Sequence, residues 1–131
     1  RGGAVYNAGT FDARNADSIS FKNNIAEGVN AHGGAFYNDE TASGDDKATL
    51  NNVEFIGNSV IDNTTLPNQA GKVIRPSGGA VYNNGKITIS NAIFKNNTVT
   101  SAIHSSFGGA FVNNSSDGSL SQIIDSSFIN R

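Results

Sequence analysis

Acidic side chains are the first residues in this chain that could do chemistry. Asp45 and Asp46 are adjacent, and paired carboxylates act as general acid and base when enzymes cleave polysaccharides. Both lie in a stretch of loop composition, as do Asp12 and Asp17. No set of acids recurs at a fixed spacing along the chain. We therefore expect solvated loop charges at these positions and no enzymatic activity.

Histidine and further acidic residues raise the question of a metal site. His32 and His104 each stand shortly before a Gly-Gly pair, but they are far apart in the chain, and a zinc site needs three or four convergent ligands. Asp39 and Glu40, together with the aspartate pair, offer clustered oxygen ligands of the kind that calcium prefers. The nonapeptide Gly-Asp calcium repeat is absent, and so is cysteine. We expect a plain acidic loop, no metal and no cofactor.

Two stretches that interrupt the regular pattern are better candidates for binding. They span 39–49 and 62–77, and loops on a rigid scaffold carry function disproportionately. The candidate binding residues in them are Asp45, Asp46, Lys72 and Arg75. The second stretch also contains the apolar residues Leu66, Val73 and Ile74. These apolar side chains either project from the surface to bind a partner or fold down and cover the side of the protein.

Composition excludes several classes of function. The chain has 131 residues, of which 15% are charged, and its net charge is -2. It therefore lacks the basic footprint of a nucleic-acid-binding protein and the basic patch of a protein that binds anionic membranes. No apolar run reaches transmembrane length and no signal peptide is visible. We expect neither nucleic-acid binding nor membrane insertion of this segment.

The elements that position these residues come from an internal repeat. A glycine motif, Gly-Gly-Ala-[Val/Phe]-[Tyr/Val]-Asn, begins at positions 2, 33, 78 and 108. A phenylalanine motif follows each copy and begins at positions 21, 55, 94 and 128. A repeat with a base length of about 30 residues is one layer of a solenoid. The expected units are 2–32, 33–77, 78–107 and 108–131, within one domain.

The composition of each unit predicts strands. Asparagine, glycine, serine and threonine favour turns over helices, and runs such as 86–90 alternate polar and apolar residues. We predict an all-β parallel β-helix of about four rungs, each with three short strands. The first strand is the glycine motif, the second resembles 87–90, and the third resembles 93–99, which passes through the phenylalanine motif.

Stacked rungs place equivalent residues above one another, about 4.8 Å apart. We expect a buried stack of Phe21, Phe55, Phe94 and Phe128. We expect one amide ladder of Asn7, Asn38, Asn83 and Asn113. A second ladder contains Asn24, Asn58 and Asn97, and it stops at Arg131. Asp125 takes a position that asparagine holds in two other units, so we interpret it as a structural substitute.

Two questions concern the glycine motif: whether its glycine pair has a structural role or binds phosphate, and which face of its strand is buried. The glycine pair suits a bend with close backbone approach, and no copy has the lysine of a phosphate-binding loop. Alternation favours an inward row of Val5, Phe36, Val81 and Phe111. The outward row, partly exposed, would then be Tyr6, Tyr37 and Tyr82. The reverse facing of the strand stays open at this point.

The alternation of the two motifs resembles the polymorphic membrane protein repeats that are associated with chlamydial surface proteins and occur in other autotransporter-like and adhesin-like bacterial proteins. The resemblance covers nearly the whole chain in four copies. It implies a right-handed parallel β-helix that is exported to the cell surface and acts in adhesion, and it supplies no catalytic residue. Departures occur at Phe36, Phe111, Val112 and Arg131.

These observations predict a structural and adhesive extracellular β-helix of a bacterial surface or secreted protein. Neither end shows a capping unit, which indicates a segment of a longer chain, a proteolytic product or a subunit with usable ends. The first alternative is therefore a filament subunit that stacks head to tail. The second is a carbohydrate-binding or carbohydrate-active β-helix. Expected partners are a ligand or carbohydrate on a host or neighbouring cell, and other copies of the chain.

Overall fold

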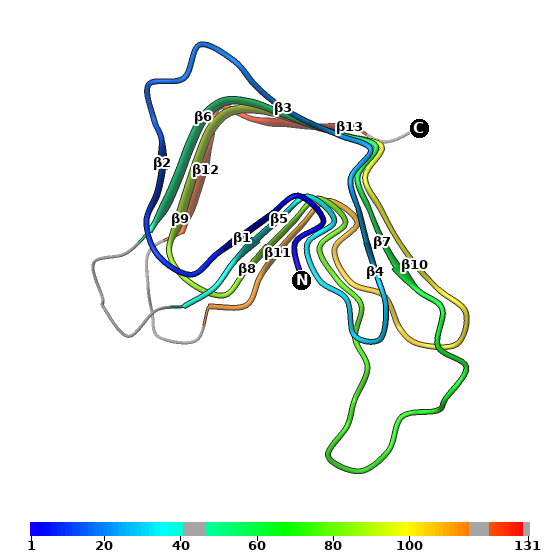
Figure 1. Cartoon of the computed structure of the whole chain (residues 1–131). Helices are drawn as coiled ribbons and strands as arrows, with labels where there is room; N and C mark the ends of the chain where they lie inside the picture. The colour runs from blue at the N-terminus through cyan, green and yellow to red at the C-terminus, as the bar shows by residue number, and fades with distance from the viewer. Residues whose placement is uncertain (41–46, 116–120, 130–131) are drawn as a thin grey trace.

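The regular secondary structure consists of β-strands throughout the residues that the computed structural model describes, which are 1–40, 47–115 and 121–129 (Figure 1). The first sheet contains β1 (Val5–Asn7), β5 (Phe36–Asn38), β8 (Val81–Asn83) and β11 (Phe111–Asn113). The second sheet contains β4 (Ile25–Glu27), β7 (Ser59–Asp62) and β10 (Thr98–Ser101). The third sheet contains β2 (Phe11–Ala13), β3 (Ile19–Lys22), β6 (Ala48–Ile56), β9 (Ile87–Lys95), β12 (Gln122–Ile124) and β13 (Ser127–Ile129).

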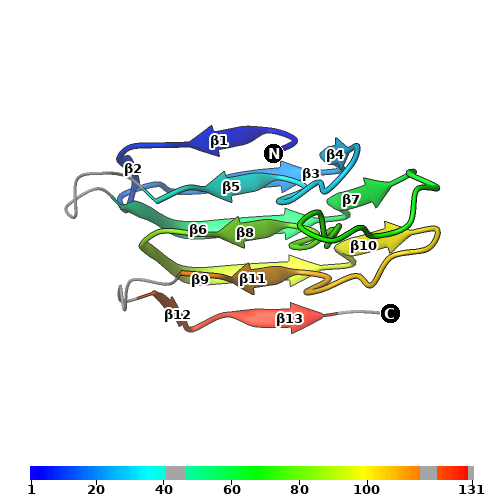
Figure 2. The same cartoon turned by 90° about the horizontal axis from the view of Figure 1, so that it is seen from below.

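The chain passes through the sheets in turn and then returns beside its own earlier strands. Figure 1 shows the first and third sheets facing each other across the main core, with the second sheet extending to one side, where it packs its own small cluster of Ala26, Ala31 and Val60. Figure 2 shows the successive passes stacked as layers. All paired strands are parallel, and their register joins equivalent residues, as where Tyr6 lies beside Tyr37 and Tyr37 beside Tyr82. The predicted all-β class is confirmed, and the arrangement of parallel sheets is consistent with a β-helix.

The strand boundaries within each unit differ from the prediction. We expected one strand to end before the phenylalanine motif, but β6 and β9 each run through it as a single strand of nine residues. These strands bend at Asn52 and Asn91, which have positive φ angles of 58° and 50°. Asparagine tolerates this left-handed conformation, and Asp125 adopts it at the equivalent corner with φ of 49°. The second sheet begins only after the second asparagine ladder, at residues such as Thr98.

The phenylalanine motifs form one stack of rings inside the third sheet. Successive ring centroids are 5.1, 4.8 and 4.5 Å apart, and neighbouring rings are parallel within 13°. Phe21, Phe55 and Phe94 are at most 9% exposed, whereas Phe128 is 54% exposed. The prediction of four buried rings is therefore wrong for Phe128, because no described layer covers its outer face.

The first sheet turns its aliphatic and phenylalanine side chains inward. Phe36 and Val81 are fully buried, and Val5 and Phe111 pack against the same core while partly buried. The opposite row of tyrosines stacks at centroid distances of 5.3 and 5.1 Å. Its middle member, Tyr37, is buried and not partly exposed as predicted, because a ring lies on each of its faces.

The glycine pairs are required for two different reasons, illustrated by one copy. Gly78 has a φ of 68°, which a residue with a side chain adopts only with strain. Gly79 is needed for space, because a Cβ atom there would lie 1.9 Å from the carbonyl oxygen of Gly109 in the next layer. The motif therefore sets the close stacking of backbones and does not form a ligand loop.

Two ladders of asparagine amides hold the layers in register. In the first, the Nδ2 atom of each residue donates to the Oδ1 atom of the next at 2.8 Å, in the order Asn7, Asn38, Asn83, Asn113. In the second, Asn24 donates to Asn58 at 2.9 Å and Asn58 to Asn97 at 3.0 Å. Asn58 also donates to the carbonyl oxygen of Phe21 at 2.9 Å and is fully buried. Arg131, predicted to end this ladder, lies outside the described residues.

Candidate binding site

Two of the four candidate binding residues from the sequence lie in the part of the chain that the structure describes. Asp45 and Asp46 lie outside the described residues. Lys72 and Arg75 are both exposed on the insertion at 62–77. In the part of the chain that the structure describes, no three His, Asp or Glu side chains lie close enough together to hold a metal ion. The same residues include no helix that could cross a membrane.

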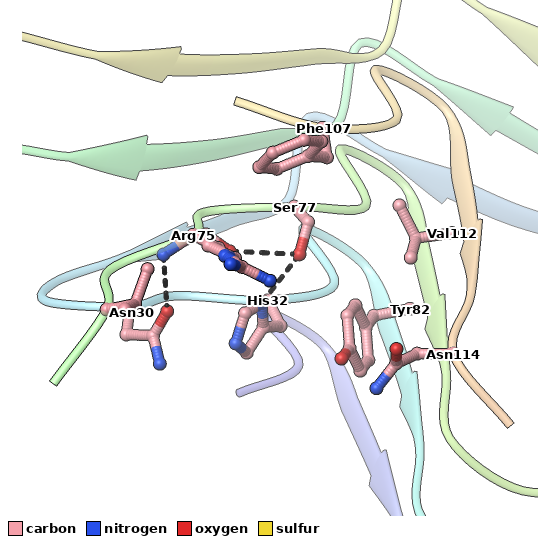
Figure 3. A pocket seen from close by; sticks show the side chains of 9 residues that line it. Asn30, His32, Arg75, Ser77, Tyr82, Phe107, Val112 and Asn114 are labelled. Carbon is pink, nitrogen blue, oxygen red and sulfur yellow. Dashed lines mark hydrogen bonds between the residues drawn. The ribbon is translucent and has the colours of Figure 1, made fainter. Parts of the chain in front are cut away.

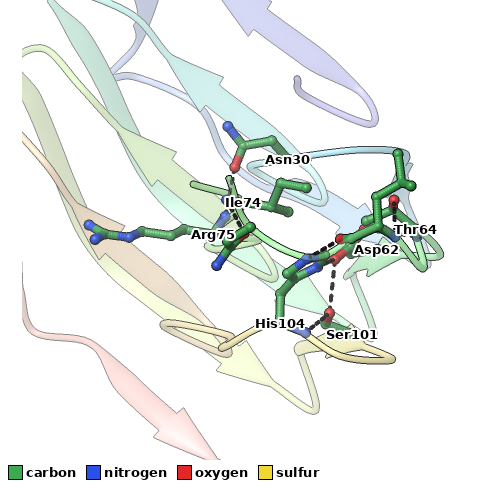
Figure 4. Close-up of polar contacts among 9 residues, drawn as sticks. Asn30, Asp62, Thr64, Ile74, Arg75, Ser101 and His104 are labelled. Atoms are coloured by element: carbon green, nitrogen blue, oxygen red, sulfur yellow. Dashed lines mark hydrogen bonds and ion pairs between the residues drawn. The ribbon is translucent and has the colours of Figure 1, made fainter. Parts of the chain in front are cut away.

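The insertion at 62–77 is anchored by a buried hydrogen-bonded pair, Asp62 and His104, that sequence reasoning missed. Asp62 ends β7, and its Oδ2 atom lies 2.6 Å from the Nδ1 atom of His104 (Figure 4). Ser101 donates to the same carboxylate oxygen at 2.8 Å, and the Nε2 atom of His104 lies 2.8 Å from the carbonyl oxygen of Leu66. Asp62 and His104 are 2% and 8% exposed. The base of the insertion is thereby tied to the adjacent layer.

The environment of Asp62 favours its charged form. Burial alone would raise the pKa of this carboxyl, but hydrogen bonds from His104, the backbone of Thr64 and Ser101 outweigh burial, and the pKa is lowered from its ordinary value. A buried carboxylate that is held in this way is costly to leave without partners. The pair is therefore a structural anchor, and His104 is not available as a ligand for a bound metal.

Beyond its anchor, the insertion follows a defined path over the surface. The backbones of Gln69 and Lys72 exchange hydrogen bonds of 2.9 and 3.2 Å, which closes the tip. The backbone nitrogen of Arg75 donates to Oδ1 of Asn30 at 2.8 Å, so the returning strand is fixed to the preceding layer (Figure 4). Leu66 is 65% exposed and Val73 is 47% exposed. These two side chains project outward and do not cover the side of the core.

The exposed apolar side chains of the insertion border a groove of about 490 Å³, which we call the Leu66 groove. Val29 forms its other wall and is 65% exposed. Lys72 lies on its rim. The groove lies next to a second hollow, because Asn30 and Val73 line both.

The second hollow, which we call the His32 pocket, has a volume of about 410 Å³ (Figure 3). The side chains that line it are Asn30, His32, Val73, Arg75, Ser77, Tyr82, Phe107, Val112 and Asn114. It thus combines aromatic rings, amides, the hydroxyls of Ser77 and Tyr82, and one guanidinium group. It lies where the insertion returns to the first sheet, so the scaffold and the insertion build it together.

One column of residues forms the inner wall of this pocket. The positions directly before the glycine pairs, which we call the pre-glycine column, pair in parallel as His32 with Ser77 and Ser77 with Phe107. The members differ in every layer, since Arg1 takes the first position. The sequence analysis considered only His32 of this column, as a possible metal ligand. The sequence signal that could have identified this column is its change of residue type from layer to layer, at a position directly before the most regular motif of the chain.

Hydrogen bonds determine which ring nitrogen of His32 carries the proton. The hydroxyl of Ser77 donates to the carbonyl oxygen of Arg75 at 3.1 Å. Its one proton is thereby used, so the Oγ atom of Ser77 accepts from the Nδ1 atom of His32 at 2.8 Å. Burial, the amino terminus and Arg1 lower the pKa of His32 to about 4. At neutral pH the ring is therefore uncharged, its Nε2 atom carries a lone pair, and it stacks on Tyr82 at a centroid distance of 4.5 Å.

The pocket carries positive charge from one side chain. Arg75 forms no ion pair with a described residue, and no described Asp or Glu side chain lines the pocket. A guanidinium group without a carboxylate partner favours an anionic ligand. The predicted candidate Arg75 is therefore placed in a hollow, whereas Lys72 lies on the rim of the neighbouring groove.

Comparison with known proteins supports the resemblance in the sequence. Residues 18–39 match the family model of the Chlamydia polymorphic membrane protein repeat. The matched segment contains both a phenylalanine motif and a glycine motif, and it includes β3, β4 and β5. The predicted similarity to this type of repeat is thus confirmed over that segment. No curated protein and no solved structure matches the chain.

Proposed function

We propose that this chain is a segment of a right-handed parallel β-helix that is displayed on a bacterial cell surface, where it has a structural and adhesive role. The match to a repeat of Chlamydia membrane proteins supports the surface location. Three parallel sheets with two asparagine ladders support the β-helix. The observation that carries the adhesive role is the pair of adjoining hollows, the Leu66 groove and the His32 pocket, that the insertion helps to form.

The insertion suits adhesion because it exposes apolar side chains on a fixed scaffold. Leu66, Val73 and Val29 lie together on the Leu66 groove and are each about half or more exposed. Clustered exposed apolar surface with a polar rim is typical of interaction sites. The proposal includes no enzymatic activity. Carboxylates such as Asp62 and Asp12 make separate contacts, with His104 and Arg14, and do not form a pair with each other.

Binding of the chain to cells tests this function. Beads coated with the 131-residue chain should bind cultured epithelial cells, and free chain should compete. The double substitution Leu66→Ser and Val73→Ser should reduce binding, because it removes the apolar surface of the groove. Ile93→Ser is the matched control, since Ile93 is 45% exposed on β9, away from the insertion. Absence of competable binding, or equal loss in both variants, would contradict the adhesive role.

Head-to-tail assembly is a second candidate function, and one observation favours it. Ile124, Phe128 and Ile129 are 42, 54 and 44% exposed on the last described layer. Such a surface favours cover by a further layer, from the same chain or from another molecule. Light scattering and negative-stain images should then reveal rods one subunit wide. A uniform monomer near 13.6 kDa would rule out this candidate.

A further inference from the structure

We propose that the His32 pocket binds a carboxylate-bearing sugar, such as a uronic or sialic acid unit of a surface glycan. The inference deepens the proposed adhesive function and rests on it for its biological setting. It names the chemical class of the ligand and the residues that recognise it. Three properties of the pocket support it: shape, hydrogen-bonding groups and charge.

The shape of the pocket suits a compact, partly apolar ligand. Its volume of about 410 Å³ lies within the range of roughly 300–1,000 Å³ that is typical of small-ligand sites. Phe107 lines it and is 47% exposed, so a face or edge of this ring is free to contact a ligand. Tyr82 and Val112 add further apolar surface (Figure 3). The C–H groups of a sugar ring can pack against such aromatic side chains.

The polar groups of the pocket suit hydroxyls, which both donate and accept. The Nε2 atom of the neutral His32 ring is an acceptor, because the Nδ1 proton is directed to Ser77. Asn30 uses its Oδ1 atom to hold the backbone of Arg75, which leaves an amide NH₂ group as a donor. Asn114 adds a second amide on the opposite side of the pocket (Figure 3), and its Nδ2 atom also donates to Oδ1 of Asn84 at 3.5 Å. Neighbouring hydroxyls of one ring require such a mixture of donors and acceptors.

The charge of the pocket selects the carboxylate. Arg75 is the one cationic side chain among the lining residues, given that His32 is neutral, and no acidic side chain opposes it. A guanidinium group matches the geometry of a carboxylate with two parallel hydrogen bonds. A single cation does not provide the basic stripe that a nucleic acid needs. A sugar acid satisfies all three properties, whereas a simple anion would leave the aromatic ring and the amides unused.

Titration of the ¹⁵N-labelled chain with four small probes tests the inference by NMR. The probes are D-glucuronic acid, N-acetylneuraminic acid, D-glucose and acetate. We expect saturable shifts at Ser77, Tyr82 and Phe107 with at least one of the two sugar acids, and weaker binding of glucose and acetate. Arg75→Gln should weaken sugar-acid binding about tenfold, as for a lost charge-assisted hydrogen bond. Phe107→Ala should also weaken it, with an unchanged far-UV circular dichroism spectrum.

Arg14→Gln is the matched control, because the side chain of Arg14 is 69% exposed and lines neither the His32 pocket nor the Leu66 groove. The inference is overturned if Arg75→Gln and Arg14→Gln bind the sugar acids equally, or if acetate or glucose binds as well as the acids do. It is also overturned if none of the probes gives saturable shifts at concentrations up to about 10 mM. Cell binding without sugar-acid binding would reject only the sugar site. Sugar-acid binding without cell binding would reject only adhesion.

Discussion

Truncation of one ring in the phenylalanine stack gives the most direct test of the layered core. Phe94 is 1% exposed and lies between Phe55 and Phe128, at centroid distances of 4.8 and 4.5 Å. Phe111 contacts it edge-on at 6.5 Å. Phe94→Ala therefore removes a fully packed ring with three aromatic neighbours.

The expected loss follows from these contacts. Replacing a buried phenylalanine with alanine costs about 3–5 kcal/mol of unfolding free energy. Each aromatic pair adds about 0.5–1.5 kcal/mol beyond buried area, so Phe94→Ala belongs in the upper half of that range. Phe128→Ala is the matched control, because Phe128 is 54% exposed and has a stacked ring on one face. We expect the control to cost about 1–2 kcal/mol, since half of its surface is already in water.

Urea unfolding followed by circular dichroism measures both values. With a urea dependence of about 2 kcal/mol per molar, Phe94→Ala should lower the midpoint by roughly 2 M and Phe128→Ala by less than about 1 M. A loss of unfolding free energy below about 1 kcal/mol for Phe94→Ala would refute the reasoning, because removal of a fully buried aromatic ring costs more than that. Equal costs for the two variants would refute it too.

Three further predictions test the ladders, the anchor and the glycine pairs. Asn58→Asp removes the two amide donations of a buried residue and should cost about 2–4 kcal/mol at pH 7 in urea unfolding. Burial beside two carbonyl oxygens raises the pKa of the new acid, so stability should recover in part as the pH falls toward ~4, where the protonated acid can donate again. Asp62→Asn should destabilise the protein by about 1–3 kcal/mol at neutral pH. The pKa of Asp62 is lowered in the folded state, so the stability that its charged form contributes is present above the ordinary aspartate pKa and is lost as the pH falls through the folded value. Plots of unfolding free energy against pH for the original chain and for Asp62→Asn should therefore converge in acid. Gly79→Ala should destabilise by about 3 kcal/mol or more through collision with Gly109, whereas Gly9→Ala, with open space around it, should leave the melting temperature equal or higher.

Each of these predictions has an outcome that contradicts it. An Asn58→Asp variant as stable as the original would mean that the second ladder does not hold the layers together. Curves for Asp62→Asn that stay parallel down to acid pH would show that ionisation of the anchor does not contribute to stability. Similar melting temperatures for the two glycine variants would show that the layers can separate at no cost.

The repeated positions were predictable because stacking forces like residues to meet. The spacing of Phe55 and Phe94, and of Asn58 and Asn97, predicts which residues lie beside each other in adjacent layers. The observed parallel pairing has this register. The strand boundaries were harder to predict. A left-handed asparagine such as Asn91 looks like a turn in the sequence, yet it bends a strand without ending it.

The binding region was only partly predictable. Arg75 was a candidate because it lies in an insertion, but the path of the insertion depends on contacts between non-equivalent positions, such as Asp62 with His104. No repeat pattern marks such a pair. The pre-glycine column gave no signal by residue type either, since its members His32 and Phe107 share only their position.

The asparagine ladders also make the two faces of the stack chemically different. Every ladder amide donates from the earlier layer to the later one. The first residue of a ladder therefore presents its amide oxygen at one end of the stack, and the last residue presents its NH₂ group at the other end. An added layer can continue the ladder only if it brings a donor to the first face or an acceptor to the last. Two identical faces would place like groups opposite each other. A two-fold symmetric dimer through either face is thereby disfavoured. The stack has an intrinsic polarity, which is set by the common direction of the side-chain amide hydrogen bonds.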